Sequence, residues 1–230
     1  MRHSRCVLVA FVEAELVSPT PPAAGTPAWY IRENALPGNR WHVRCIISNL
    51  HDDAEIFDGP VDDAGGFQQW EVDLDASGNL RIAMNPVLLG GAASMWFVAV
   101  EELEAPEPAV SLVAFDNDLR PPGTVVSNAE FFTMPVRSED QAAAVRWYLD
   151  GAVDQVFVAP DWRRKGVGSA LLFSADCYHQ ARGFPGALRS DGHRTAMGET
   201  FTASLRFPDR MAPLSEMAPP MDPPDGAEAD

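Results

Sequence analysis

A short segment in the C-terminal half of the chain combines cations and glycines in a spacing that suits an anion. It contains Arg163, Arg164, Lys165, Gly166 and Gly168, and the lysine is the only one in the chain. Glycine lets the backbone approach a ligand closely, and the N–H groups in the first turn of a helix have no intrahelical partner. If a helix begins here, its dipole adds partial positive charge at the same place. The segment therefore predicts a site for phosphate or pyrophosphate.

The flanking residues predict a strand before this segment and a helix after it. The β-rich runs 142–149 and 152–160 are separated by Asp150-Gly151, a dipeptide typical of tight hairpins, so two antiparallel strands are expected. Apolar residues then recur at helical spacing until Gly183. The expected geometry is a strand, a basic glycine turn and a helix.

Two other glycine-rich phosphate-binding patterns do not fit the spacing. The Walker pattern needs a lysine after its glycines, whereas here the lysine precedes them, and the dinucleotide pattern needs a third glycine or alanine where this chain has Leu171. The remaining alternative is a helix that begins with glycines and binds nothing. Three consecutive cations would then repel one another beside the positive end of a helix dipole, without compensation.

Residues 156–172, VFVAPDWRRKGVGSALL, resemble motif A of the GNAT N-acetyltransferase superfamily, which has [QR]xxGxG/A after a strand ending in V-x-P. The resemblance implies acetyl-CoA as the co-substrate, with its pyrophosphate on the loop amides and its pantetheine arm along the preceding strand. The implied cofactor-binding residues are Val156, Phe157, Val158, Arg163, Arg164, Lys165, Gly166, Val167, Gly168 and Ser169.

The resemblance covers residues 109–207 and implies an order of elements within them. Strands are expected at 125–136, 142–149, 152–158 and 187–191, the pyrophosphate helix at 168–182, and the last helix at 195–205. The first strand and the two helices that cover the acceptor site in the family are not readable here, because a β-rich segment precedes residue 109. The resemblance therefore leaves the acceptor unassigned.

Acyl transfer to an amine needs a base for the amine proton and an acid for the leaving thiolate. Asp154, on the strand beside the donor, and Glu199, on the last helix, are the candidate bases. Many family members use a tyrosine of the last helix as the acid, but this helix offers Phe201. Tyr148, at the end of the preceding strand, is the candidate phenol, whereas Tyr178 follows the apolar helix stripe and is expected in the core.

Three functions remain open at this stage. The first is an acyl-CoA dependent N-acyltransferase that acts by direct transfer on a small-molecule or peptide amine. The second is a non-catalytic module of the same fold that binds CoA and other proteins, which the missing helix tyrosine favours. The third is a GNAT-fold enzyme that transfers a different group. His193 and Arg194, between the fifth strand and the last helix, are further candidates for contact with the donor phosphate or the acceptor.

The charge distribution narrows the choice of partners. The chain has a formal net charge of −16, and residues 50–76 contain nine acids and no lysine or arginine. Nucleic acid would be repelled there, so no nucleic-acid partner is expected. The acids would suit a cationic acceptor, and a solvated face that keeps the protein soluble explains them equally well. Residues 160–194 contain six lysines and arginines against three acids, which makes them a basic island in an acidic protein.

The overall pattern predicts a mixed α/β (α+β) fold with a mostly antiparallel, GNAT-like sheet and flanking helices. Three regions are expected: a β-rich N-terminal region at 1–108, an acyl-CoA-binding domain at 109–207, and a disordered, proline-rich acidic tail at 208–230. The early apolar run, Cys6 to Val12, is too short to span a membrane and is closed by acids, so a cytoplasmic protein is expected. Three cysteines and five histidines without ligand spacing predict no disulfide and no metal.

Overall fold

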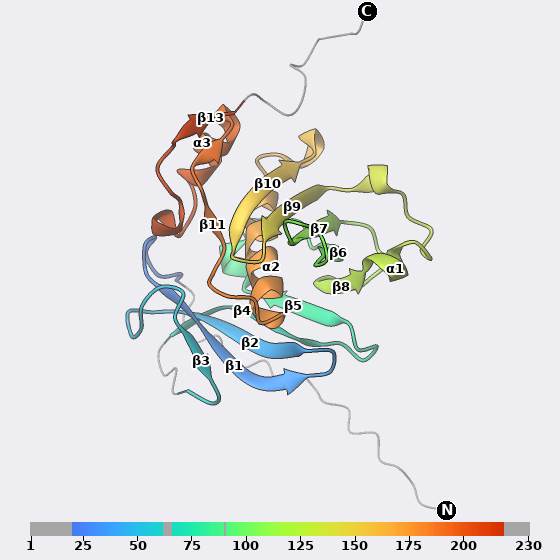
Figure 1. Ribbon diagram of the computed structural model, residues 1–230, viewed down its shortest axis with the longest axis horizontal. Helices are drawn as coiled ribbons and strands as arrows, with labels where there is room; N and C mark the ends of the chain where they lie inside the picture. Colours follow the sequence, from blue (N-terminus) through green and yellow to red (C-terminus); the bar gives the residue numbers. More distant parts are fainter. Residues whose placement is uncertain (1–19, 62–65, 90, 219–230) are drawn as a thin grey trace, which may run out of the picture.

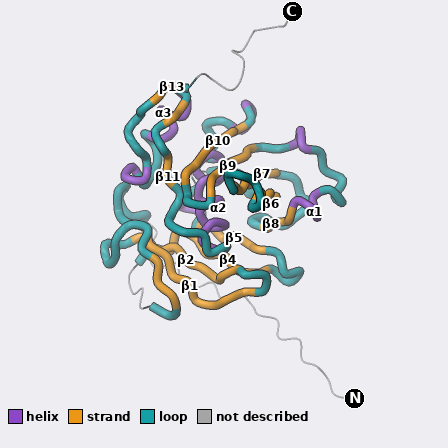
Figure 2. The backbone as a smooth tube through the Cα atoms, in the orientation of Figure 1, coloured by secondary structure: helices purple, strands orange, loops and turns teal. Residues whose placement is uncertain are grey.

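The computed structural model describes residues 20–61, 66–89 and 91–218, and strands make up most of its regular structure (Figure 2). The elements are β1 (Ala28–Leu36), β2 (Arg40–Ile47), β3 (Ile56–Asp58), β4 (Phe67–Leu74), β5 (Leu80–Met84), η1 (Pro86–Leu88), β6 (Trp96–Glu102), β7 (Ala109–Phe115), β8 (Thr124–Ser127), α1 (Asn128–Phe131), η2 (Ser138–Asp140), β9 (Ala143–Tyr148), β10 (Ala152–Val158), η3 (Pro160–Trp162), α2 (Val167–Ala181), β11 (Arg189–Ser190), β12 (His193–Arg194), α3 (Ala196–Thr202), η4 (Pro208–Arg210) and β13 (Glu216–Met217).

Eleven of these strands form one sheet, in the order β11-β10-β9-β7-β6-β8-β5-β4-β2-β1-β3. Most neighbours are antiparallel, and the parallel pairs are β1 with β3, β6 with β8, and β10 with β11. The expected mixed α/β class with a mostly antiparallel sheet is therefore confirmed at this level.

The short connections follow the turn chemistry of the sequence. Gly38 and Asn39 have positive φ between β1 and β2, and Gly151 has positive φ between β9 and β10. Between β4 and β5, the Asp75 carboxylate accepts hydrogen bonds from the amides of Ser77 and Asn79. Glycine, asparagine and aspartate favour such turns because they tolerate positive φ or bond to nearby amides. The hairpin at Asp150-Gly151 was expected from the sequence.

The helix α2 is the centre of the fold, and all of its residues except Gly168, Ser169 and Leu172 are buried. Strands β1, β2 and β4 lie below it in Figure 1 and β9 and β10 above it, and it packs against strands from both halves of the sheet. Its buried residues include the polar Ser174, Asp176, His179 and Gln180 beside the expected apolar stripe. A helix covered all round has no solvated face, so polar side chains on it need internal partners.

His179 shows how one of these buried groups is satisfied. Its Nδ1 accepts a hydrogen bond from the Trp147 indole at 3.1 Å, and its Nε2 lies 3.0 Å from the carbonyl oxygen of Pro185. Indole N–H is only a donor, so the ring is neutral with its proton on Nε2. Burial lowers the pKa of His179, which agrees with this form.

The boundary expected at residue 108 falls in the connection between two neighbouring strands of the sheet. Strands β6 and β7, on either side of that position, pair along their full length from Trp96↔Phe115 to Glu102↔Ala109. One core cluster contains residues from β1 through Leu188, including Tyr30, Trp70 and Trp147. The regions expected as 1–108 and 109–207 thus share one sheet and one core over the described residues.

One expected strand is much shorter in the structure. The run 125–136 was predicted as a strand, but β8 ends at Ser127 and α1 follows. The Ser127 hydroxyl accepts a hydrogen bond from the Glu130 amide and caps this helix. β8 lies between β6 and β5, whereas β9 lies between β10 and β7, so β8 and β9 are not neighbours.

Residues 208–218, which were expected in a disordered tail, are ordered elements of this fold. They contain η4 and β13, and Arg210 has only 8% of its side chain exposed. Its guanidinium donates to both carboxylate oxygens of Asp53 at 2.7 and 2.8 Å and to the Tyr30 hydroxyl at 2.7 Å. The Tyr30 hydroxyl donates in turn to Asp176 on α2 at 2.8 Å. The buried ion pair and hydrogen bonds of Arg210 hold this segment against the rest of the fold. The proline-rich composition of the segment gave no sign of these contacts. Residues 219–230 lie outside the described residues.

Cys45 and Cys177 are buried free thiols, and Cys6 lies outside the described residues. No helix among the described residues is long and apolar enough to cross a bilayer.

Candidate functional site

The basic glycine turn joins β10 to α2 through η3. The Trp162 amide donates to the Ala159 carbonyl at 2.8 Å and the Arg163 amide to the Pro160 carbonyl at 3.2 Å, which closes the turn after the strand. Gly166 is the N-cap of α2 with φ of 76°. The first amides of a helix have no intrahelical acceptor, and within the described ranges no side chain accepts from those of Val167, Gly168 and Ser169. The predicted strand, turn and helix are therefore confirmed.

The outer edge of β10 is open next to this turn. β11 pairs with β10 only at Ala152↔Arg189 and Val153↔Ser190. Beyond Val153 no described strand pairs with this edge of β10. The pairing of β10 with β9 also shifts register between Val153 and Gln155, so Asp154 lies at a bulge. A bulge bends the strand and leaves backbone groups unpaired.

Protein groups already lie against both glycines of the turn. A Cβ on Gly166 would be 2.5 Å from the carbonyl oxygen of Leu89, and a Cβ on Gly168 would be 3.1 Å from the Phe201 ring of α3. Close contacts with other parts of this protein therefore already favour glycine at both positions, apart from any contact with a ligand. Sequence reasoning did not anticipate these two contacts, because both partners lie far from the turn along the chain.

The three cations of the turn have different surroundings. Arg163 is half-buried, and its Nε donates to the Val158 carbonyl at 3.0 Å. The Lys165 ammonium lies 5.1 Å from the centre of the Trp162 ring, within the range of a cation–π contact. Arg164 is exposed and has φ of 58°. Arg164 and Lys165 are therefore the two cations of this turn that face solvent.

Asp154 and Tyr148 both contact Arg146 of β9. The arginine donates to Asp154 Oδ2 at 2.9 Å and to Glu102 Oε2 at 3.0 Å. Its guanidinium carbon also lies 5.5 Å from the centre of the Tyr148 ring. The structure thus brings two of the three predicted catalytic residues to one arginine, and Asp154 is held as a paired, part-exposed carboxylate.

Glu199, the third predicted catalytic residue, is paired with Arg194 at 2.8 Å. Arg194 also donates to the Ser190 hydroxyl and to the Ala212 carbonyl, so it joins β11, α3 and the C-terminal segment. Its side chain is only 8% exposed. These contacts show that Arg194 stabilises the packing of these three segments. His193 is exposed, 3.5 Å from Asp191.

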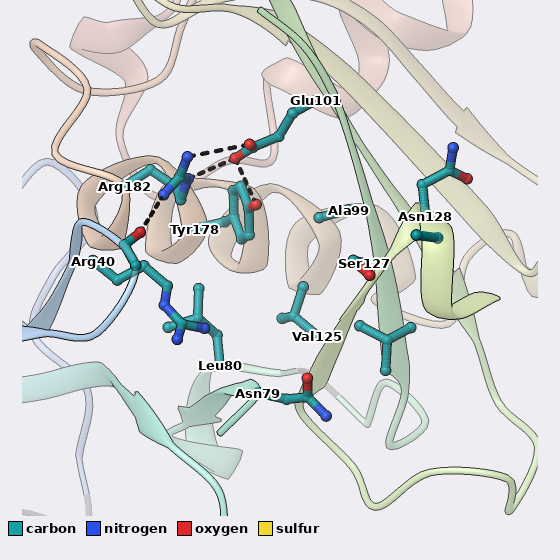
Figure 3. Close-up of a pocket in the computed structure, with 13 residues that line it drawn as sticks. Arg40, Asn79, Leu80, Ala99, Glu101, Val125, Ser127, Asn128, Tyr178 and Arg182 are labelled. Carbon is teal, nitrogen blue, oxygen red and sulfur yellow. Dashed lines mark hydrogen bonds and ion pairs between the residues drawn. The ribbon is translucent and has the colours of Figure 1, made fainter. Parts of the chain in front are cut away.

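Tyr178 lies in the core, as predicted, but its hydroxyl reaches a pocket at the far end of α2 (Figure 3). The hydroxyl donates to Glu101 Oε1 at 2.8 Å, and Arg182 binds both oxygens of the same carboxylate. Burial, and then the Glu101 charge, raise the pKa of Tyr178. Ten residues of helix separate Gly168 from Tyr178, about 15 Å along the axis, so this phenol is remote from the glycine turn.

The pocket has a volume of about 400 Å³, and its lining includes residues of β2, β5, β6, β8, α1 and α2. Sequence reasoning missed it. The two arginines of the pocket, Arg40 and Arg182, are 142 positions apart in the sequence, and no local pattern relates one to the other.

His42 is held between two carboxylates on the outer side of β2. Its Nε2 lies 2.8 Å from Glu71 and its Nδ1 3.1 Å from Glu33. The hydrogen bond to Glu71 is the main cause of a raised pKa of His42, and it outweighs the effect of burial. Among the described residues, no group of three or more histidine, cysteine or acidic side chains is arranged to hold a metal ion.

The raised pKa makes the contribution of His42 to stability depend on pH. The imidazolium form stabilises the fold fully below the unfolded-state pKa of about 6.5, and this contribution is lost as pH rises through the higher folded-state pKa. We expect His42→Gln to lower the free energy of unfolding by about 1–2 kcal/mol at pH 5.5 and by less at pH 9. Urea unfolding of both proteins at the two pH values measures this, and an equal loss at both would contradict it.

No protein-family model, curated protein or solved structure matches this chain. The resemblance to the GNAT superfamily thus depends on the sequence motif at residues 156–172.

Proposed function

We propose that this chain is an acyl-CoA dependent N-acyltransferase of the GNAT type, with acetyl-CoA as the co-substrate and an amine as the acceptor. The observation that carries the proposal is the junction of β10 and α2. There, a basic glycine turn lies between an open strand edge and the free amides of a long helix. A coenzyme A molecule has a pyrophosphate and an amide-containing arm, which suit these two neighbouring features.

The groups that would hold coenzyme A are mostly backbone groups. The amides of Val167, Gly168 and Ser169 would bind the pyrophosphate at the positive end of the helix dipole. The unpaired edge of β10 at Val156 would bind the amides of the pantetheine arm as an added strand does. The exposed cations of the turn add attraction for the phosphates in an otherwise acidic protein.

The reaction assigned to this site is attack of a neutral amine on the thioester carbonyl. A C–N bond forms, the C–S bond breaks, the amine loses one proton and the thiolate gains one. Asp154 at the bulge is the residue proposed to take the amine proton, and Tyr148 is proposed to protonate the thiolate. Their shared contact with Arg146 supports a common role. Glu199, which is paired with Arg194, is the alternative base.

A specific observation favours a second candidate, the non-catalytic CoA-binding module. Each candidate base is already bound by an arginine, and α3 presents Phe201 to the turn where a tyrosine would serve as the acid. Such a protein would bind coenzyme A without transferring the acyl group.

Calorimetric titration with acetyl-CoA, followed by an acceptor screen, tests the proposal. Binding together with acetyl transfer above the rate without enzyme, on a panel of amines, polyamines, aminoglycosides and peptides, is the result expected of the enzyme. Binding without transfer would favour the module. An absence of any affinity for coenzyme A would refute both candidates.

A charge reversal in the turn gives a sharper expectation. Lys165→Glu should weaken acetyl-CoA binding about tenfold at low salt, and the difference should shrink as salt screens the exposed charges. The matched control is Arg137→Glu, which makes the same change of net charge at a side chain that is 72% exposed and remote from the turn in sequence. Equal affinities for the two variants would show that the turn does not contact the phosphates.

A further inference from the structure

We infer that the pocket at the C-terminal end of α2 binds a small organic anion through Arg40. The inference does not depend on the proposed coenzyme A site, because the pocket and the glycine turn lie at opposite ends of the helix. Arg40 and Arg182 lie on one side of the pocket, and Ser127 and Asn128 lie on the opposite side (Figure 3).

The charges that line the pocket do not cancel. Among the described residues that line it, those with formal charge are Arg40, Arg182 and Glu101. Arg182 binds both oxygens of Glu101, at 2.5 and 3.1 Å, so these two charges form a pair. Arg40 contributes Nε to the Pro37 carbonyl and Nη1 to the Gly78 carbonyl, both neutral acceptors. Over the described ranges no carboxylate lies within ion-pair distance of Arg40, so the pocket retains one positive charge.

Of the acids next to lining residues along the chain, Glu130 is paired with an arginine, whereas Asp75 keeps its own charge, since among the described residues only backbone amides bind it. Asp75, at the turn before β5, accepts hydrogen bonds from the amides of Ser77 and Asn79. Glu130 of α1 is paired with Arg120 at 2.7 Å. The chain has a net charge of −16, which repels anions in general. The unpaired charge of Arg40 is therefore the feature that would attract an anion to this pocket.

The neutral polar groups of the lining also favour an acceptor-rich ligand. Ser127 accepts from the Glu130 amide, and its hydroxyl hydrogen is left to donate. In the part of the chain that the structure describes, the side-chain amides of Asn79 and Asn128 form no hydrogen bond. Carboxylate and phosphate oxygens accept from such donors and from arginine.

The rest of the lining defines the body of the ligand. Leu80, Ala99 and Val125 give the pocket apolar surface beside the Tyr178 ring. A volume of about 400 Å³ is in the range of small-molecule sites. The ligand class is therefore a small molecule with an apolar body and one carboxylate or phosphate group, directed to Arg40.

Three probes with the same ring test the inference on the unmodified protein. They are phenylacetate, phenyl phosphate and the neutral phenylacetamide, titrated by calorimetry at low and high salt. We expect at least one anion to bind at least tenfold more tightly than the amide, with an affinity that falls as salt rises. Tighter binding of phenylacetate would identify a carboxylate ligand, and tighter binding of phenyl phosphate a phosphate ligand.

Two variants locate the binding. Arg40→Gln and Asn79→Asp should each weaken the preferred anion at least tenfold, the first by removing the charge and the second by adding a repelling one. Arg137→Gln, which removes one positive charge from an exposed loop, should leave the affinity unchanged. Equal binding of anion and amide, no binding of any probe, or unchanged affinity in both pocket variants would overturn the inference.

Discussion

Replacing Arg210 with alanine lowers the free energy of unfolding by about 3–5 kcal/mol. The arginine is the buried centre of a network that joins the C-terminal segment to Asp53, to Tyr30 of β1 and to Asp176 of α2. Burial alone lowers the pKa of Arg210, but Tyr30, Asp53 and Asp176 outweigh it and the pKa is raised. The charge is therefore retained, and its removal leaves Asp176, with 9% of its side chain exposed, without a counter-ion among the described residues.

Urea unfolding at pH 7 measures this loss, and Arg137→Ala serves as the matched control. That arginine also contacts two acids, but at 72% exposure its removal is expected to change stability by less than about 0.5 kcal/mol. Adding Asp176→Asn to the Arg210→Ala variant should restore part of the loss, because it removes the uncompensated charge. A loss below about 1 kcal/mol for Arg210→Ala would show that the network contributes little.

The second large effect concerns the glycine turn. Gly168→Val should weaken acetyl-CoA binding at least about a hundredfold, because a branched side chain at the first helical turn blocks approach to the amides. The structure adds a complication, since a Cβ at this position also meets the Phe201 ring at 3.1 Å. A loss of binding in this variant alone would therefore have two explanations.

A double variant separates the two explanations. Phe201→Ala removes the ring and should bind acetyl-CoA nearly as well as the unmodified chain. Gly168→Val combined with Phe201→Ala should still bind at least about a hundredfold more weakly, if the valine excludes the phosphates directly. Recovery of affinity in the double variant would mean that the valine acts by displacing α3. Far-ultraviolet circular dichroism and urea unfolding verify that each variant is folded.

The sequence by itself determined the local elements around the proposed site. Asp150-Gly151 specified the hairpin of β9 and β10, Pro160 the end of β10, and Gly166 the start of α2, because each acts through backbone conformation within a few residues. The same local logic failed at 125–136, where the Ser127 cap favoured a helical turn over continued strand.

Only the tertiary structure decided how the two halves of the chain combine and which charges are buried. The hydrogen bond from Tyr30 to Asp176 joins residues 146 positions apart, and that from Arg182 to Glu101 joins residues 81 positions apart. Such contacts depend on the wrapping of one sheet around α2, which no local pattern encodes. The pocket and the Arg210 network arise in the same way, because both are formed by side chains that meet only when the sheet has curved around the helix.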